Sequence, residues 1–145
     1  MYKGWIMENR KCIAVLTEKP SLDYQSGILK GIYRSAFSHD VNVAVFCVTS
    51  TRSDEAYQIG EMVIFSLLGD YSSFSGVIYL PDTIDYSMRD TLITEKLIAA
   101  SRKIKIPVVT IDGNYDEFPC FLSDDSEPIQ FLVEHLSVGH GCKDI

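Results

Sequence analysis

Short apolar runs alternate with segments of helical periodicity along almost the whole chain, and this alternation restricts the fold more than any other feature. The apolar runs are continuous, which is typical of strands buried on both faces of a parallel sheet. Four are clear and the fifth is weaker: KCIAVLTE (11–18), VNVAVFCV (41–48), GVIYL (76–80), IPVVTID (106–112) and CFLS (120–123).

Apolar residues at helical spacing predict four helices between and after these runs. Their expected ranges are 21–37, from Ser53 or Asp54 to about Leu68, 85–103, and 124–138. The last carries one apolar stripe, made of Ile129, Leu132, Val133 and Leu136, with Leu136 expected to face inward. Within 85–103, the residues expected to face inward are Leu92, Ile93, Leu97 and Ala100. Strict alternation predicts an α/β fold, doubly wound, with a mostly parallel sheet of flavodoxin-like strand order and helices on both faces.

Composition narrows the possible partners and the compartment. The 145 residues suit one domain, and the formal net charge of −7 argues against a nucleic-acid-binding surface, which needs clustered Lys and Arg. No apolar stretch is long enough for a bilayer, and the first residues lack the apolar core of a signal peptide. The four cysteines form no C-x-x-C pair, so we expect reduced thiols and a cytoplasmic protein.

In a sheet of this kind, ligands bind where the loops that follow the strands converge. These loops read TEKPSLDY, TSTRSD, LPDTIDYS, TIDGNYDE and SDDSEP, and they are rich in Asp, Ser, Thr and Tyr. Such residues suit a polar solute, although helix capping and contact with water explain them equally well. The phosphate loop, the G-x-G-x-x-G turn and the G-x-S-x-G elbow do not occur, so neither catalysis nor a cofactor is expected.

The chain closes on HLSVGHGCKDI, which resembles a metal cluster only superficially. His135, His140 and Cys142 have no second cysteine or acidic ligand at a recognised spacing, and His39 lies in an expected turn. The sequence therefore predicts no metal site.

The same C-terminal segment resembles the effector-binding domain of LacI-type transcription regulators, which share their fold with type I periplasmic binding proteins. In that family an IPVV-x-ID strand precedes a short strand ending in Asp, a helix carrying E-H-L, and a Gly-His or His-Gly-Cys turn. Asp124 falls on the family's Asp, Glu134 begins the E-H-L triplet, and His140 begins the turn. The resemblance implies that this turn is structural and leads into a further strand.

The earlier chain fits the same family. SLDYQSGILKGIYRSA matches the first helix, with Lys30, Gly31 and Ile32 on the R-G-I signature, and GVIYLP matches the third strand. Tyr24 falls where the family usually has an aromatic residue that packs on the ligand, although Asp23 stands where Pro is common. The match covers residues 11–145, with 1–10 expected to be a loosely ordered leader.

The resemblance implies the N-terminal lobe of a two-lobed sensor, truncated before the second lobe. It implies that a sugar- or nucleoside-like effector binds in the cleft between the lobes, and that hinge closure passes the signal on through a homodimer. Ten residues before the first strand cannot hold a helix-turn-helix, so we expect no direct DNA contact. The output would then be another domain of the same polypeptide, such as a GGDEF, histidine kinase or AraC-type DNA-binding domain. The expected ligand contacts are Thr17, Tyr24, Asp82, Asp112 and Asp124. Tyr33 and Phe37 are candidates for the subunit interface, although packing in the core explains these two residues equally well.

Two alternatives remain open. A receiver domain of a two-component system has the same alternation, and here Glu18 would supply one acidic residue and Asp82 the phosphoacceptor, without the Met-Pro signature. A flavodoxin-like enzyme is also possible, but no phosphate loop supports it.

Overall fold

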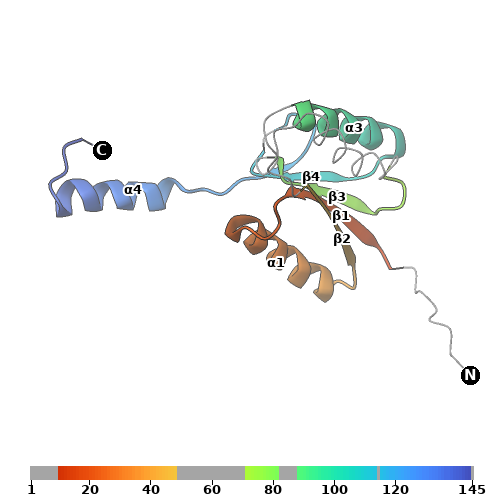
Figure 1. The fold of residues 1–145 in the computed structure, drawn as a ribbon, viewed down its shortest axis with the longest axis horizontal. Coiled ribbons are helices and arrows are strands. Elements are labelled where there is room, and N and C mark those ends of the chain that lie inside the picture. The colour runs from red at the N-terminus through yellow and green to blue at the C-terminus, as the bar shows by residue number, and fades with distance from the viewer. Residues whose placement is uncertain (1–9, 49–70, 82–87, 114, 145) are drawn as a thin grey trace, which may run out of the picture.

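The chain folds around a parallel sheet, shown in the computed structural model of Figure 1, which describes residues 10–48, 71–81, 88–113 and 115–144. The sheet has five strands in the order β2-β1-β3-β4-β5, and every neighbouring pair is parallel. This is the flavodoxin-like order and confirms the expected fold class. The strands are β1 (Cys12–Glu18), β2 (Asn42–Val48), β3 (Gly76–Tyr79), β4 (Val108–Ile111) and β5 (Cys120–Phe121).

Both faces of the central strands are buried, which explains their continuous apolar runs. Along β1, Val15 packs into a cluster on one face, while Ala14 and Leu16 belong to a larger cluster on the other. All three side chains are fully buried. Each run therefore stabilises the sheet from two sides, at about 25 cal/mol for every Å² of apolar surface removed from water.

Among the described helices, two cover opposite faces of the sheet, as expected for a doubly wound fold (Figure 1). On one side, α1 (Asp23–Ser38) packs Leu29 beside Val15. On the other side, α3 (Met88–Ile104) places three buried residues, Ile93, Leu97 and Ala100, in the larger cluster.

The outer half of α1 carries the two aromatic residues for which both core packing and an interface were open. Its buried residues are Gln25, Leu29 and Ala36, whereas Phe37 is 90% exposed and Tyr33 is 47% exposed. Residues one position apart lie about 100° apart around a helix, so Phe37 cannot face the sheet when Ala36 does. Phe37 therefore does not belong to the core of this lobe.

The larger cluster also holds a tyrosine that is almost completely buried. Tyr71 is 1% exposed, and its hydroxyl has no hydrogen-bond partner within the described parts of the chain. Burial away from water raises the pKa of Tyr71 to about 12, because the phenolate form loses its hydration.

The last helix, α4 (Ser126–Glu134), and the π-helical turn η2 (His135–Gly139) lie apart from the sheet, at the end of an extended arm (Figure 1). The predicted helix over 124–138 is present, but the expectation that Leu136 faces inward is wrong. The apolar stripe is exposed, with values of 57% for Ile129 and Leu132, 42% for Val133 and 39% for Leu136. The arm leaves the sheet after β5, so it brings the stripe to none of the described sheet faces.

Several expectations fall outside the described residues. The predicted helix that ends near Leu68, the first nine residues and Asp82 are among them. Among the helices that the structure does describe, none combines the length and the apolar character needed to cross a membrane.

Candidate functional site

The strand order places a topological switch point at the carboxyl ends of β1 and β3. Strand β1 connects to β2 on one side, while the chain continues from β3 to β4 and β5 on the other. The loops diverge at such a point and leave a crevice, where open α/β sheets bind their ligands. The segments that follow β1 and β4 are described here, and both carry predicted site residues.

Tyr24 and Asp112 meet directly at this edge. They are 88 residues apart in the sequence, and the Tyr24 hydroxyl donates a hydrogen bond to Oδ2 of Asp112. Tyr24 lies in the first turn of α1, whereas Asp112 immediately follows β4. The tyrosine side chain is 48% exposed, so its ring remains open to a ligand.

Asp112 also fixes the next strand. Its Oδ1 accepts a hydrogen bond from the backbone N–H of Ser123 at 3.0 Å, and its own N–H donates to the Phe121 carbonyl at 2.8 Å. One carboxylate therefore joins α1, β4 and the segment after β5. Each oxygen accepts one of these bonds and has a further lone pair that a ligand hydroxyl can use.

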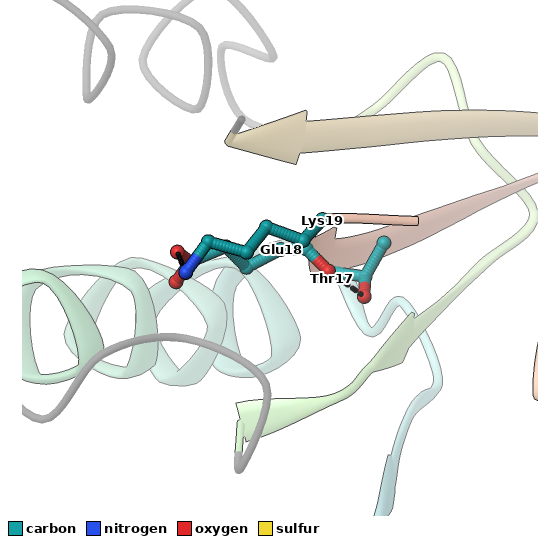
Figure 2. A network of polar contacts seen from close by, with 3 residues as sticks. All are labelled: Thr17, Glu18 and Lys19. Carbon is teal, nitrogen blue, oxygen red and sulfur yellow. Dashed lines mark hydrogen bonds and ion pairs between the residues drawn. The ribbon is translucent and has the colours of Figure 1, made fainter. Parts of the chain in front are cut away.

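A half-buried ion pair lies at the end of β1 (Figure 2). Oε1 of Glu18 lies 2.9 Å from Nζ of Lys19, and the Glu18 side chain is only 3% exposed while that of Lys19 is 37% exposed. Figure 2 shows both side chains extending the same way beyond the strand. In the sequence, Glu18 was considered only as an acidic residue of a receiver domain. Its position at the end of a buried apolar run was the feature that could have indicated this ion pair.

The backbone is unusual at both strand ends of the site. Lys19 has φ 42° and Asp112 has φ 57°, which are left-handed values that residues other than glycine seldom adopt. Successive side chains normally point to opposite faces of a strand, and the turn at Lys19 lets its ammonium group reach Glu18. Such conformations cost roughly 1–3 kcal/mol and cluster at binding and active sites.

The other predicted residues lie less directly at the edge. Thr17 is fully buried, and its hydroxyl donates to the Glu18 carbonyl at 3.3 Å. Asp124 is exposed, and its Oδ1 accepts the N–H of Ser126, the first residue of α4, at 3.1 Å. Hydrogen bonds from the Ser126 hydroxyl and backbone lower the pKa of Asp124. Asp124 directly follows Ser123 in the chain and is thereby linked to Asp112.

An apolar hollow of about 390 Å³ lies elsewhere, beneath the second half of α1. Its lining belongs to α1 and to the amino ends of the strands, opposite the site: Ile13, Gly31, Ile32, Ser35, Ala36, His39, Val41 and Ile78. The residues described at the carboxyl edge include Tyr24, Asp112 and the Glu18–Lys19 pair, and these polar side chains suit one side of a ligand cleft.

Comparison with solved structures identifies this architecture. A LacI-family regulator from Weissella paramesenteroides with bound glucose matches with a TM-score of 0.56 at 19% identity over 87% of this chain. A LacI regulator from a Rhodococcus species gives 0.60 at 18% over 88%, and the lac repressor dimer bound to operator and the anti-inducer ONPF gives 0.61 at 19% over 89%. The chain has the fold of LacI-family regulators.

This likeness is one of fold and extends over part of those proteins. The chain spans 41% of the length of each of the three solved structures. No protein-family model matches the sequence, and no curated protein resembles it closely enough to count as a relative. The LacI-type fold agrees with the resemblance seen in the sequence motifs.

Proposed function

We propose that the sheet with α1 and α3 forms the N-terminal lobe of a two-lobed, LacI-type sensor, which binds a small polyol, such as a sugar or nucleoside, at the carboxyl edge of the sheet. The observation that carries this proposal is the contact between Tyr24 and Asp112, which joins two distant segments at the switch point. The carboxylate accepts hydrogen bonds from ligand hydroxyls, and the tyrosine ring offers an apolar face to a sugar or base. Nothing in this role requires catalysis.

The position of α4 supports a missing second lobe. Its apolar residues are 42–67% exposed, and among the described elements its main packing partner is η2, which directly follows it. An exposed apolar stripe of this kind marks an interaction surface. In the proposal, α4 begins the second lobe, and the extended segment after β5 is one of the hinge strands. The neighbouring solved proteins extend well beyond the matched length, which leaves room for such a lobe.

The test uses a longer product of the gene that includes the sequence after Ile145, screened by thermal shift against sugars and nucleosides. One solute is expected to raise the melting temperature, and Tyr24→Phe is expected to reduce that rise. Tyr33→Phe is the matched control, because Tyr33 lies on the same helix and is almost equally exposed, at 47% against 48%. Equal rises in the two variants would place the ligand elsewhere.

The residues 1–145 alone give a second, independent test. Half a cleft loses half of its contacts and cannot close, so we expect weak or undetectable binding of the solute that stabilises the longer product. Tight binding by the shorter chain would contradict the interlobe cleft, even if the Tyr24 result were as expected.

We also expect the sensor to form a homodimer through α1. Phe37 is 90% exposed and lies beside Tyr33 on a half-open face of the helix. A large exposed aromatic residue at the centre of an interface often contributes much of its binding energy. Light scattering after size exclusion is expected to show a dimer that Phe37→Ser dissociates, and a dimer unchanged by this substitution would place the interface elsewhere.

The receiver alternative shares the strand order but not the position of the last helix. In a complete doubly wound domain the crossover helices pack on the sheet, whereas α4 lies away from it. Treatment with acetyl phosphate followed by intact-mass measurement separates the two hypotheses. A phosphoryl adduct on Asp82 would favour the receiver, and we expect none.

A further inference from the structure

A pair of histidines forms at the C-terminal end of the arm, outside the proposed sugar site. His135 begins the π-helical turn η2, and His140 follows its last residue. A π-helix closes its hydrogen bonds between residues five apart, so it places residues i and i+5 on one side of the helix. His135 and His140 have this spacing, and their Nε2 atoms lie 3.0 Å apart.

The separation suits a shared metal ion. Zinc binds imidazole nitrogen at about 2.0–2.1 Å, so two nitrogens on one ion at angles of about 90–110° lie roughly 2.8–3.4 Å apart. The measured 3.0 Å falls within this interval. Imidazole is a favoured ligand of zinc, copper and nickel.

The surrounding residues hold both rings in place. Phe131, one helical turn earlier, stacks on His135 with ring centroids 6.4 Å apart and 15° between the planes. The two imidazoles meet edge to face, at 4.7 Å and 78°. Beyond His140, Gly141 takes φ 67° and Cys142 donates its N–H to the Leu136 carbonyl at 3.1 Å, which folds the chain back on η2. The pair is therefore partly organised before any ion binds.

We propose that His135 and His140 chelate a divalent transition-metal ion of the zinc, nickel or copper class through their Nε2 atoms. In the part of the chain that the structure describes, no group of three or more His, Cys, Asp or Glu residues is placed to hold an ion, so the protein supplies two ligands and water the others. Both residues belong to an exposed segment that an ion can reach. Without an ion, the Nε2–H of one ring donates to Nε2 of the other. The ion takes the place of this proton, and the donor ring changes tautomer so that it carries its proton on Nδ1. The site is independent of the proposed solute binding.

The test is isothermal titration of the 145-residue chain, prepared without a histidine tag, with zinc, nickel and copper salts. One ion per chain is expected, with copper tightest, following the general order of divalent-ion affinities. Replacing either histidine by alanine removes the chelate and is expected to weaken binding by about a hundredfold. Because the substitutions lie in an exposed arm, circular dichroism is expected to show an unchanged sheet domain.

Two matched control variants distinguish metal binding at the histidine pair from metal binding at other residues of the chain. His39 lies at the end of α1, in the sheet domain and away from the arm, with its Nδ1 2.8 Å from the Ser35 carbonyl oxygen. The His39→Ala variant is expected to bind metal as the parent chain does. Cys142→Ser is likewise expected to retain binding. Proton NMR supplies a second readout, in which zinc shifts the imidazole signals of His135 and His140 but not that of His39.

The proposal is overturned if the parent chain binds none of the three ions. It is also overturned if binding survives both histidine substitutions, or if it depends on Cys142 and not on the histidines. In either case the two imidazoles form a hydrogen-bonded pair that ends the helix and nothing more.

Discussion

Tyr71 predicts how the stability of the lobe changes in alkali. Its side chain is 1% exposed in the larger core cluster, and burial raises its pKa to about 12. In the unfolded chain the same phenol ionises near pH 10. Between these values the unfolded state has lost a proton that the folded state keeps. Stability contributed by the neutral phenol is therefore complete below pH 10 and is lost as the pH rises through about 12.

The magnitude follows from the two pKa values. One pKa unit corresponds to about 1.4 kcal/mol, so the full loss above pH 12 is roughly 2.7 kcal/mol. At pH 11, midway between them, the free energy of unfolding is expected to be about 1.4 kcal/mol lower than at pH 8 through this residue alone. Other tyrosines, lysines and cysteines also titrate in this range, so the comparison must isolate Tyr71.

Urea unfolding at pH 8 and pH 11 makes that comparison for the parent chain, Tyr71→Phe and Tyr33→Phe. The parent and Tyr33→Phe are expected to lose about 1.4 kcal/mol more between the two pH values than Tyr71→Phe does, because Tyr33 is 47% exposed. An equal loss in all three proteins would refute the reasoning, as would an absorbance titration in which every tyrosine ionises near pH 10.

Three further predictions test the fold. A Cβ on Gly113 would lie 1.8 Å from Cγ of the Pro81 ring, which cannot rotate away, so Gly113→Ala is expected to cost about 1–3 kcal/mol in urea unfolding. Leu97→Ala in the core is expected to cost about 2–5 kcal/mol, whereas Leu132→Ala on α4 is expected to change stability by less than about 0.5 kcal/mol. Hydrogen bonds with Ser126 lower the pKa of Asp124, so their contribution at the start of α4 is complete above the usual carboxyl pKa and is lost as the pH falls through the lowered value. Circular dichroism is expected to show an acid loss of helix that Asp124→Ala abolishes.

The sheet could be predicted from the sequence because each strand corresponds to a recognisable apolar run. Continuous apolar runs such as Cys12–Glu18 and Asn42–Val48 are explained by burial on both faces, and alternation with helices leaves few arrangements. The inward residues of α3 were predicted from their helical spacing. The surroundings of Phe37 were not predicted, because an apolar residue at helical spacing indicates an apolar environment without saying whether the core or a partner provides it.

The site was predictable only in part. That Asp112 lies at the carboxyl edge follows from its place after a strand, but its bond to Tyr24 depends on the start of α1 and the end of β4 lying side by side. The Glu18–Lys19 pair depends on a left-handed residue that no sequence rule required at Lys19. The histidine pair likewise depends on a π-helical turn, whose five-residue register differs from the α-helical spacing by which helical faces are assigned.

The arm shows that an amphipathic pattern indicates that one face of a helix packs against something, but not which surface it packs against. The stripe on α4 satisfies the same spacing rule as the buried face of α3, yet α3 lies against the sheet and α4 does not. The difference arises from the connection. The segment after β5 runs outward, and Asp112 holds the start of that segment through Ser123. The residue proposed to accept a ligand hydroxyl therefore also sets the direction of the arm. A ligand that competes for Asp112 would act directly on the link between the two proposed lobes, which is where a hinge-closing sensor has to couple binding to movement.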